Sequence, residues 1–317
     1  MSASKALGNT GLRISPLVLG GNVFGWTLDA RASHELLSAA FEVGITTVDT
    51  ADVYSNWVEG HAGGESELII GQWLAANPGL RDRLILFTKV GAPMGESGGL
   101  SRQWILRAVE DSLRRLRTDY IDLYFSHYPD VQTPHEETLR AYESLILSGK
   151  VRAIGASNYS REQLDAAQAT ASDAGLPSYG ALQLEYNLYD RQGYETQLQA
   201  YAQANNLGVV SYFSLASGFL SGKYRTLDDI CQAARAEDLE RYFTERGQRI
   251  LDALALLSER LGVSPASIAL AWLMAQPGIS APIASATSLA QLRALQAAMT
   301  LELDEAALRM LRQASAW

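Results

Sequence analysis

Cysteine is nearly absent from this sequence of 317 residues, and its scarcity is informative. The single cysteine, Cys231, rules out a disulfide bond within the chain, which is typical of proteins of the reducing cytoplasm. Cys231 also has no obvious partner nearby in the sequence that would activate it as a nucleophile, so we expect an inert thiol. The sequence therefore predicts a cytoplasmic protein.

Long apolar runs and an excess of basic residues are missing as well. The sequence contains no run of 18 apolar residues, so it predicts no membrane-spanning helix. The opening segment MSASKALGNTGLRISP lacks the basic start and apolar stretch of a signal peptide. Lys and Arg total 26 against 35 for Asp and Glu, which gives a formal charge of -9. Because an acidic surface repels phosphate backbones, we expect neither nucleic acid nor a membrane as a partner. The net charge still leaves room for a small basic pocket.

What the sequence does contain is a regular alternation of two patterns. Short runs of β-branched and apolar residues alternate with longer segments of helical period, which favours βαβ units and a parallel sheet. The eight predicted strands are residues 15–21, 45–51, 84–90, 121–128, 151–158, 179–187, 207–215 and 279–287. Eight right-handed units close into a barrel more naturally than they form an open sheet of this length.

The predicted fold is therefore α/β, a single (β/α)8 TIM barrel domain over residues 1–317. It has an N-terminal β-hairpin at residues 5–15 and an extra C-terminal helix at 303–317. Residues 216–245 interrupt the alternation and are expected to form a loop over the site. The other predicted helices are residues 30–44, 64–77, 101–118, 133–150, 160–175, 194–206, 258–278 and a helix from about 289.

Four polar residues follow or end three successive predicted strands: Asp49, Tyr54, Lys89 and His127. In a parallel barrel, such residues open onto the face where catalysis takes place. The carboxylate would hold the ammonium against the phenol, and this positive charge would lower the phenol pKa from about 10. The phenol could then protonate a carbonyl oxygen whose carbon receives a hydride, with the imidazole orienting that oxygen. None of these steps requires a metal, and the sequence offers no His/Asp/Glu spacing typical of metal ligands.

Each of these residues also has an ordinary structural interpretation when it is taken alone. Asp49 and Lys89 could form a purely structural ion pair, Tyr54 could serve packing, and His127 could be a satisfied buried imidazole. Four chemically compatible groups at successive strand ends are difficult to obtain by packing alone. The combination therefore favours a proton-transferring enzyme.

Several segments together resemble the aldo-keto reductase superfamily, in particular its soluble bacterial branch. TTVDTADVYSN, FTKVG and DLYFSHYPD are similar to the signatures that bear the aspartate and tyrosine, the lysine and the histidine. GKVRAIGASNYS, LQLEYNLYDR and VVSYFSLASGFLSGKY follow in the family's order, and the resemblance extends from about residue 5 to 300. This ordered set is specific for the superfamily and much less specific for a substrate.

The resemblance implies reversible hydride transfer between NADPH and an aldehyde or ketone. Tyr54 would be the general acid/base, Lys89 the modulator of its pKa, Asp49 the partner of the lysine, and His127 the residue that orients the carbonyl. Ser157, Asn158 and Gln183 would hold the nicotinamide carboxamide, and Tyr212 would stack on its ring. The implied cofactor-binding residues are Gly20, Gly21, Asn22, Asp49, Ser157, Asn158, Gln183, Tyr212, Leu215, Ser217, Gly218, Lys223, Ser285, Thr287 and Gln291.

The segment expected to bind the cofactor phosphate departs from the family pattern. PIASATSLAQLRALQ lacks the usual basic residue and the Glu-Asn pair, which Ala294 and Leu295 replace. An arginine clamp for a 2′-phosphate is not evident, although Arg293 or Lys223 could substitute. The resemblance thus implies NADP(H), with NAD(H) as an open alternative.

Four aromatic residues lie in loops expected at the mouth of the barrel: Phe24, Trp26, Trp57 and Tyr128. They suit apolar carbonyl compounds or sugar faces as substrates, or they simply cover the core. Residues 55–67 form the expected specificity loop. The expected partner is a small-molecule carbonyl or alcohol, while the natural substrate, the direction of reaction and the oligomeric state stay open.

Two other classes of function are considered. The first is a nucleotide-binding regulatory subunit, because the superfamily includes barrel proteins that attach to ion channels and turn over slowly. The second is a different barrel enzyme that uses a metal, for which the sequence offers little support.

Overall fold

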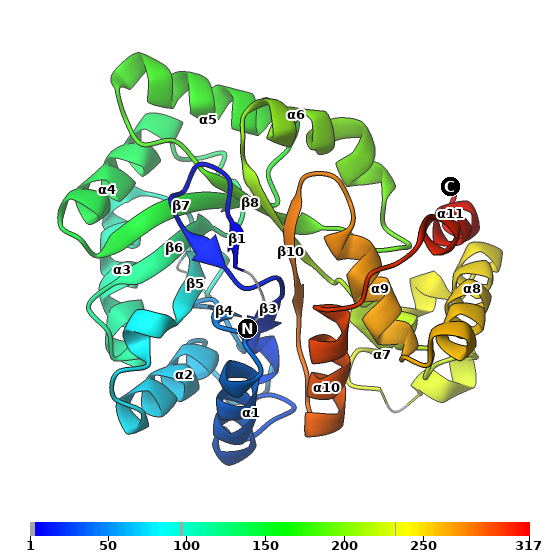
Figure 1. Cartoon of the computed structure of the whole chain (residues 1–317). Coiled ribbons are helices and arrows are strands. Elements are labelled where there is room, and N and C mark those ends of the chain that lie inside the picture. Colours follow the sequence, from blue (N-terminus) through cyan, green and yellow to red (C-terminus); the bar gives the residue numbers. More distant parts are fainter. Residues whose placement is uncertain (1–3, 96–97, 232) are drawn as a thin grey trace.

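The fold is a closed barrel of parallel strands surrounded by helices (Figure 1). A computed structural model describes residues 4–95, 98–231 and 233–317, so residues 1–3, where the predicted domain begins, lie outside it. Within the described residues, eight parallel strands close in the order β10-β3-β4-β5-β6-β7-β8-β9. The strands are β3 (Val18–Gly20), β4 (Thr47–Asp49), β5 (Ile85–Val90), β6 (Ile121–Ser126), β7 (Val151–Ser157), β8 (Ala181–Glu185), β9 (Gly208–Tyr212) and β10 (Ile279–Ala284). The predicted (β/α)8 TIM barrel is confirmed.

The predicted N-terminal hairpin is also confirmed, and it closes one end of the barrel. Strands β1 (Lys5–Ala6) and β2 (Arg13–Ile14) pair antiparallel. The hairpin buries Leu7, Leu12 and Ile14 against residues of the barrel interior, among them Phe87, Leu123, Phe125 and Val210. The hairpin backbone lies so close to the start of β9 that a Cβ added at Gly8 would come within 2.1 Å of the Gly208 nitrogen. Because this plug fills the amino-terminal end, a ligand site is left to the carboxyl-terminal end.

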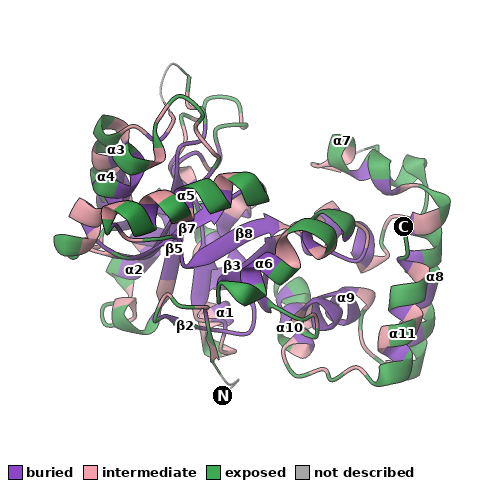
Figure 2. Cartoon of the chain, turned by 90° about the horizontal axis from the view of Figure 1, so that it is seen from above, coloured by how far each residue is buried: buried purple, intermediate pink, exposed green. Residues whose placement is uncertain are grey.

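The helices cover the outside of the barrel and bury the main hydrophobic core between themselves and the strands (Figure 2). Ser101 is the N-cap of α3 and accepts a hydrogen bond from the Trp104 amide. The helices are α1 (Ala30–Glu42), α2 (Glu65–Ala76), α3 (Arg102–Leu116), α4 (His135–Leu147), α5 (Arg161–Ala174), α6 (Gln199–Ala204), α7 (Ala236–Leu239), α8 (Glu245–Leu261), α9 (Pro265–Met274), α10 (Leu289–Ala298) and α11 (Glu305–Ala314).

The stretch after β9 differs from its prediction as a simple loop. Short helical segments at Ala216–Ser221, Leu227–Ile230 and Glu240–Tyr242 accompany α7 within it. The single helix predicted over residues 258–278 is instead divided between the end of α8, which begins at Glu245, and α9. Helix α8 forms because Ile250, Leu251, Leu254 and Leu257 share one face and are buried. The predicted C-terminal helix is α11, which packs against α8 in both views (Figures 1 and 2).

No single helix among the described residues has the length and apolar composition needed to cross a membrane. Helices α8 and α9 reach that length and composition only together, as a pair bent by 99°.

Candidate functional site

The polar residues singled out in the sequence gather at the carboxyl-terminal end of the barrel, here called the mouth. Asp49 is the last residue of β4, Lys89 the second last of β5, and His127 follows β6 directly. Ser157 ends β7 and Tyr212 ends β9. Because parallel strands end on the same side, side chains from distant parts of the sequence meet there.

The centre of the site is a buried ammonium between a carboxylate and a phenol. The Lys89 Nζ atom donates to Asp49 Oδ2 at 2.8 Å, to the Thr50 carbonyl oxygen at 2.7 Å, and to the Tyr54 hydroxyl at 3.2 Å. Lys89 is 0% exposed and Asp49 is 3% exposed. Asp49 Oδ1 accepts a further bond from Gln183 Nε2 at 2.8 Å, so both carboxylate oxygens have partners. The His127 ring lies edge-on to Tyr54, with ring centroids 6.0 Å apart.

Burial reverses one expectation, the lowered pKa of Tyr54. Desolvation raises the pKa of the phenol above its usual value, and this effect outweighs the opposing attraction of Lys89. For Lys89, burial acts to lower the pKa, but Asp49 and Tyr54 overcome it and the pKa is raised. Burial, with a contribution from Lys89, holds the pKa of His127 well below its usual value. At neutral pH the site therefore contains a protonated lysine, a protonated tyrosine and a neutral histidine.

The residues expected to hold a nicotinamide lie beside this centre and are bonded to one another. Asn158 adopts a left-handed backbone conformation, with φ of 62°. Its Nδ2 donates to the His127 carbonyl oxygen at 2.9 Å and to Ser157 Oγ at 3.2 Å. The Tyr212 hydroxyl donates to Asn158 Oδ1 at 2.7 Å. The chain thus fixes the orientation of the Tyr212 ring and of the Asn158 amide.

A second group of expected cofactor residues lies where β3 and β10 meet. Ser285 Oγ donates to Asn22 Oδ1 at 2.6 Å. A Cβ added to Gly20 would lie 2.5 Å from that same Ser285 oxygen, and one added to Gly21 would lie 2.9 Å from the Asp49 carbonyl oxygen. Gly21 therefore allows a close approach of backbone that a side chain would hinder, while Gly20 leaves room for the Ser285 hydroxyl.

The remaining expected cofactor residues occupy two neighbouring segments at the mouth. Thr287 donates to Gln291 Oε1 through its amide at 2.7 Å and its hydroxyl at 3.1 Å, at the start of α10. After β9, Leu215 is half-buried, while Ser217 and Gly218 adopt positive φ values. The Ser217 hydroxyl is buried and has no hydrogen-bond partner within residues 4–95, 98–231 and 233–317. Lys223 is exposed, with its Nζ 4.4 Å from the centroid of the Tyr224 ring.

Three of the four aromatic residues expected at the mouth have ring contacts that lead to Tyr54 or His127. The Trp57 ring centroid lies 5.5 Å from Tyr54 and 5.6 Å from Trp26, and Tyr128 stacks on His127 at 4.8 Å. Trp57 and Tyr128 are each 46% exposed. Phe24 is the exception, because its side chain is fully buried in the main core. The expectation that Phe24 contacts substrate is therefore corrected to a packing role.

Two buried carboxylates near the tetrad of Asp49, Tyr54, Lys89 and His127 escaped the sequence analysis. Glu67 accepts from Thr88 at 2.6 Å and pairs with Arg115 at 2.7 Å. Asp52 is 1% exposed, and neither of its carboxylate oxygens has a hydrogen-bond partner among the described residues. Desolvation, together with repulsion from Glu67, raises the pKa of Asp52 to about 8. The sequence places Asp52 close to Asp49 but does not reveal that burial and the charge of Glu67 raise the pKa of its side chain.

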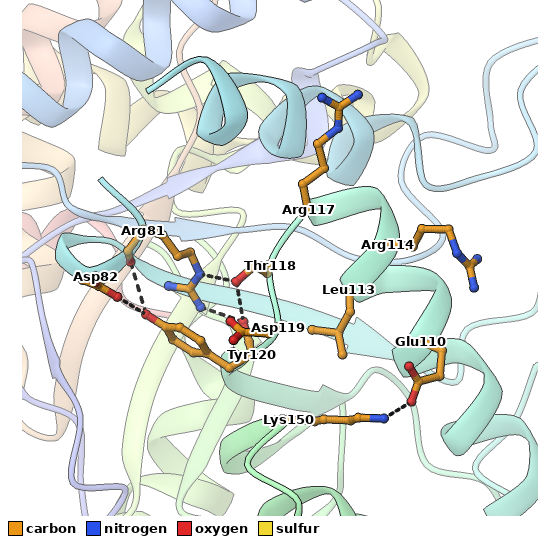
Figure 3. Close-up of a pocket in the computed structure, with 10 residues that line it drawn as sticks. All are labelled: Arg81, Asp82, Glu110, Leu113, Arg114, Arg117, Thr118, Asp119, Tyr120 and Lys150. Atoms are coloured by element: carbon orange, nitrogen blue, oxygen red, sulfur yellow. Dashed lines mark hydrogen bonds and ion pairs between the residues drawn. The ribbon is translucent and has the colours of Figure 1, made fainter. Parts of the chain in front are cut away.

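A surface groove elsewhere does not coincide with this site. Figure 3 shows its lining, in which Arg81 donates to the Tyr120 carbonyl oxygen and Lys150 pairs with Glu110. Arg81, Tyr120 and Lys150 lie just before β5, β6 and β7, at the amino-terminal end of the barrel. The groove is therefore at the opposite end from the tetrad.

Comparison with known proteins agrees with this geometry. The model of the "Aldo/keto reductase family" matches residues 16–316. The chain belongs to this family. It is 36% identical over 312 residues to an "Uncharacterized oxidoreductase YrpG" of Bacillus subtilis, covering 96% of this chain and 93% of that protein. It is 35% identical over 309 residues to "Aldo-keto reductase YhdN" of the same organism, covering 92% and 86%.

A relative of another kind is a "Probable voltage-gated potassium channel subunit beta" of Oryza sativa. It is 34% identical over 293 residues, which cover 89% of this chain and 87% of that protein. The resemblance stated from the sequence is thus confirmed. Membership in the aldo/keto reductase family supports a redox function, an enzyme of the oxidoreductase class, a nicotinamide cofactor and a small-molecule substrate.

The buried Asp52 leads to a prediction about stability. Between about pH 4, the usual pKa of an aspartate, and about pH 8, the pKa in the folded protein, the folded state retains a proton that the unfolded chain releases. This contribution to stability is complete below pH 4 and is lost as the pH rises toward 8. Asp52→Asn stays neutral at every pH and should therefore lack this loss.

The free energy of unfolding of Asp52→Asn relative to wild type should rise by several kcal/mol from acidic to alkaline pH, since each pKa unit corresponds to about 1.4 kcal/mol. Urea unfolding of both proteins, at pH values below and above the titration of Asp52, measures this difference in the free energy of unfolding. Parallel pH curves for the two proteins would show that Asp52 is not protonated in the folded state.

Proposed function

We propose that this protein is an NADP(H)-dependent reductase of aldehydes or ketones, which also oxidises the corresponding alcohols, with Tyr54 as its general acid/base. One observation carries the proposal: the buried Lys89 ammonium lies 3.2 Å from the Tyr54 hydroxyl and 2.8 Å from Asp49. A structural ion pair needs no phenol beside it. We further propose that the protein acts in the cytoplasm, in keeping with its single, unpaired cysteine.

The chain's own residues handle the proton. Tyr54 donates a hydrogen bond to the carbonyl oxygen and transfers its proton to it, and Lys89 stabilises the resulting tyrosinate. Asp49 keeps Lys89 charged, and neutral His127 donates a hydrogen bond that orients the same oxygen. When bound, a reduced nicotinamide would supply the hydride to the carbonyl carbon, and the product would be an alcohol. Solvent then returns a proton to Tyr54.

Features at the mouth fit a dinucleotide. The buried Ser217 hydroxyl lacks a partner among the described residues and suits a polar ligand atom. The start of α10, with Ser288 as N-cap, presents backbone amides that attract phosphate oxygens. Asn158 and Tyr212 form a preset hydrogen-bonded surface beside the tetrad for the nicotinamide. We assign the 2′-phosphate of NADP(H) to the segment from Ser285 to Gln291, assisted by Lys223.

The second candidate is a nucleotide-binding regulatory subunit with little turnover. The identity to the potassium channel subunit beta of Oryza sativa favours it. The tetrad is compatible with both functions, because such a subunit can retain the catalytic groups. Tight nucleotide binding without turnover across a broad panel of carbonyl compounds would support this candidate.

The role of Tyr54 yields a direct prediction. Tyr54→Phe removes the proton donor and keeps the ring, so reduction of 4-nitrobenzaldehyde should fall by about 100-fold or more. The affinity for NADPH should remain unchanged, because the phenol contacts the carbonyl and not the dinucleotide. Loss of absorbance by the reduced nicotinamide measures the first quantity, and quenching of tryptophan fluorescence the second.

A matched control for this variant is Tyr120→Phe, which removes a phenol at the opposite end of the barrel. It should reduce the aldehyde at the wild-type rate. Normal turnover by Tyr54→Phe would show that another group provides the proton.

The raised pKa of Tyr54 predicts the pH dependence of reduction. Because burial keeps the phenol protonated, kcat/KM for aldehyde reduction should stay constant from about pH 6 to pH 9 and fall only at higher pH. Steady-state kinetics in overlapping buffers measures the profile. A loss of rate with an apparent pKa near neutrality would mean that the charge of Lys89 affects the pKa of Tyr54 more than burial does.

The choice of cofactor is tested by titration with both nucleotides. We expect NADPH to bind at least about 10-fold more tightly than NADH, since each charge-assisted contact to the 2′-phosphate strengthens binding. Lys223→Met should reduce this ratio while leaving the affinity for NADH unchanged. Equal affinities in the wild-type protein would assign NAD(H) instead.

A further inference from the structure

The segment between β9 and α8 contacts two sides of the mouth. We call residues 222–231 and 233–244 the covering segment. On one side, Arg241 pairs with Glu185, the last residue of β8, and with Asp190 at 3.3 Å. On the other side, the Arg235 guanidinium carbon lies 5.1 Å from the ring centroid of Trp26, in the loop after β3. The covering segment thus brings a cation to the aromatic wall of the site.

Two of the three arginines of this segment, Arg235 and Arg241, lie at the mouth and differ in how their charge is balanced. Arg241 has carboxylate partners, as described above. Arg235 is half-buried, and among the described residues no carboxylate lies within ion-pair distance of it and no acceptor receives a hydrogen bond from it. Desolvation lowers the pKa of Arg235, and Asp238 opposes this effect only from a distance. A half-buried guanidinium without a close counter-charge is costly unless a ligand supplies one.

A row of aromatic rings connects Arg235 to the reacting phenol. The guanidinium lies over Trp26, the Trp26 centroid is 5.6 Å from that of Trp57, and Trp57 is 5.5 Å from Tyr54. A substrate whose carbonyl meets Tyr54 would lie along these rings, with its far end at Arg235. Flat apolar walls suit the body of such a molecule, and the guanidinium suits a planar anion at its end.

We infer that Arg235 binds a carboxylate of the substrate, so that the preferred substrates are aldehydes or ketones carrying a carboxylate about one aromatic ring or short chain away from the carbonyl. This inference rests on the proposed carbonyl reductase function. A carboxylate matches the planar fork of the guanidinium and can accept two parallel hydrogen bonds from it. The competing interpretation is that Arg235 only holds the covering segment against Trp26 by stacking.

The experiment compares two aldehydes of similar size, 4-carboxybenzaldehyde and 4-nitrobenzaldehyde, with NADPH as reductant. Arg235→Met keeps an apolar side chain on Trp26 and removes the charge. We expect kcat/KM for the carboxylate to fall by about 10- to 100-fold, mainly through KM, because a charge-assisted pair is lost. The value for the nitro compound should change by less than about twofold. Arg235→Lys should recover part of the loss, since it restores the charge without the fork.

Arg246→Met is the matched control. Arg246 is also half-buried and also stacks on an aromatic ring, with its guanidinium carbon 3.8 Å from the centroid of Tyr189. The Arg246→Met substitution should leave the kinetics of reduction of both aldehydes unchanged. The same loss in Arg246→Met as in Arg235→Met would overturn the inference, because a general loss of arginine–aromatic stacking would then explain the effect.

Three further outcomes separate the inference from the function on which it rests. Equal losses for both aldehydes in Arg235→Met would assign a packing role and overturn the inference while the reductase function stands. A matching loss of NADPH affinity would assign Arg235 to the cofactor, which also overturns it. If the wild-type protein binds NADPH and reduces neither aldehyde, the proposed function fails and the inference fails with it.

Discussion

The burial of the Lys89 ammonium is the constraint on which the site depends. Removing a lysine from water costs several kcal/mol, and this cost is offset only when other groups satisfy the charge and its hydrogen-bond donors. Asp49, the Thr50 carbonyl oxygen and the Tyr54 hydroxyl do so together. The position of Tyr54 therefore follows from the lysine's need for an acceptor. A phenol held in this way is placed beside a fixed positive charge before any substrate arrives.

This arrangement in turn depends on the closure of the barrel. Asp49 lies on β4 and Gln183 on β8, which are on opposite sides of the strand order, yet the two side chains hydrogen-bond at 2.8 Å. The bond therefore crosses the interior, and only a closed barrel of this size allows it. The hairpin plug of Leu7, Leu12 and Ile14 fills the other end with apolar side chains. One end of the barrel contributes stability, while the other is left to polar groups.

The sequence predicted the barrel and its tetrad because both depend on local order. Each strand shows as an apolar run, and parallel strands necessarily end on one side, so residues such as Lys89 and His127 could be placed together from the sequence. Features that depend on three-dimensional surroundings could not. The sequence shows that Lys89 is near Tyr54 but not that burial outweighs its charge, so the expected direction of the phenol pKa was wrong. Phe24 and Trp26 are two residues apart, yet one packs in the core and the other lines the mouth.

Arg235 is the clearest example of this limit, because more than half of the chain separates it from Trp26 in sequence. The tetrad itself is compatible with a carbonyl reductase and with a nucleotide-binding subunit, so it does not decide between these two proposed functions. The residues that decide between the two functions must lie around the mouth, where they admit or exclude a substrate. Trp57 and Tyr128 remain half-exposed, and the covering segment contributes a cation whose charge no described carboxylate balances at close range. The Arg235 guanidinium lies over Trp26, in the row of rings that leads to Tyr54, so a substrate held along these rings would be selected by charge as well as by shape.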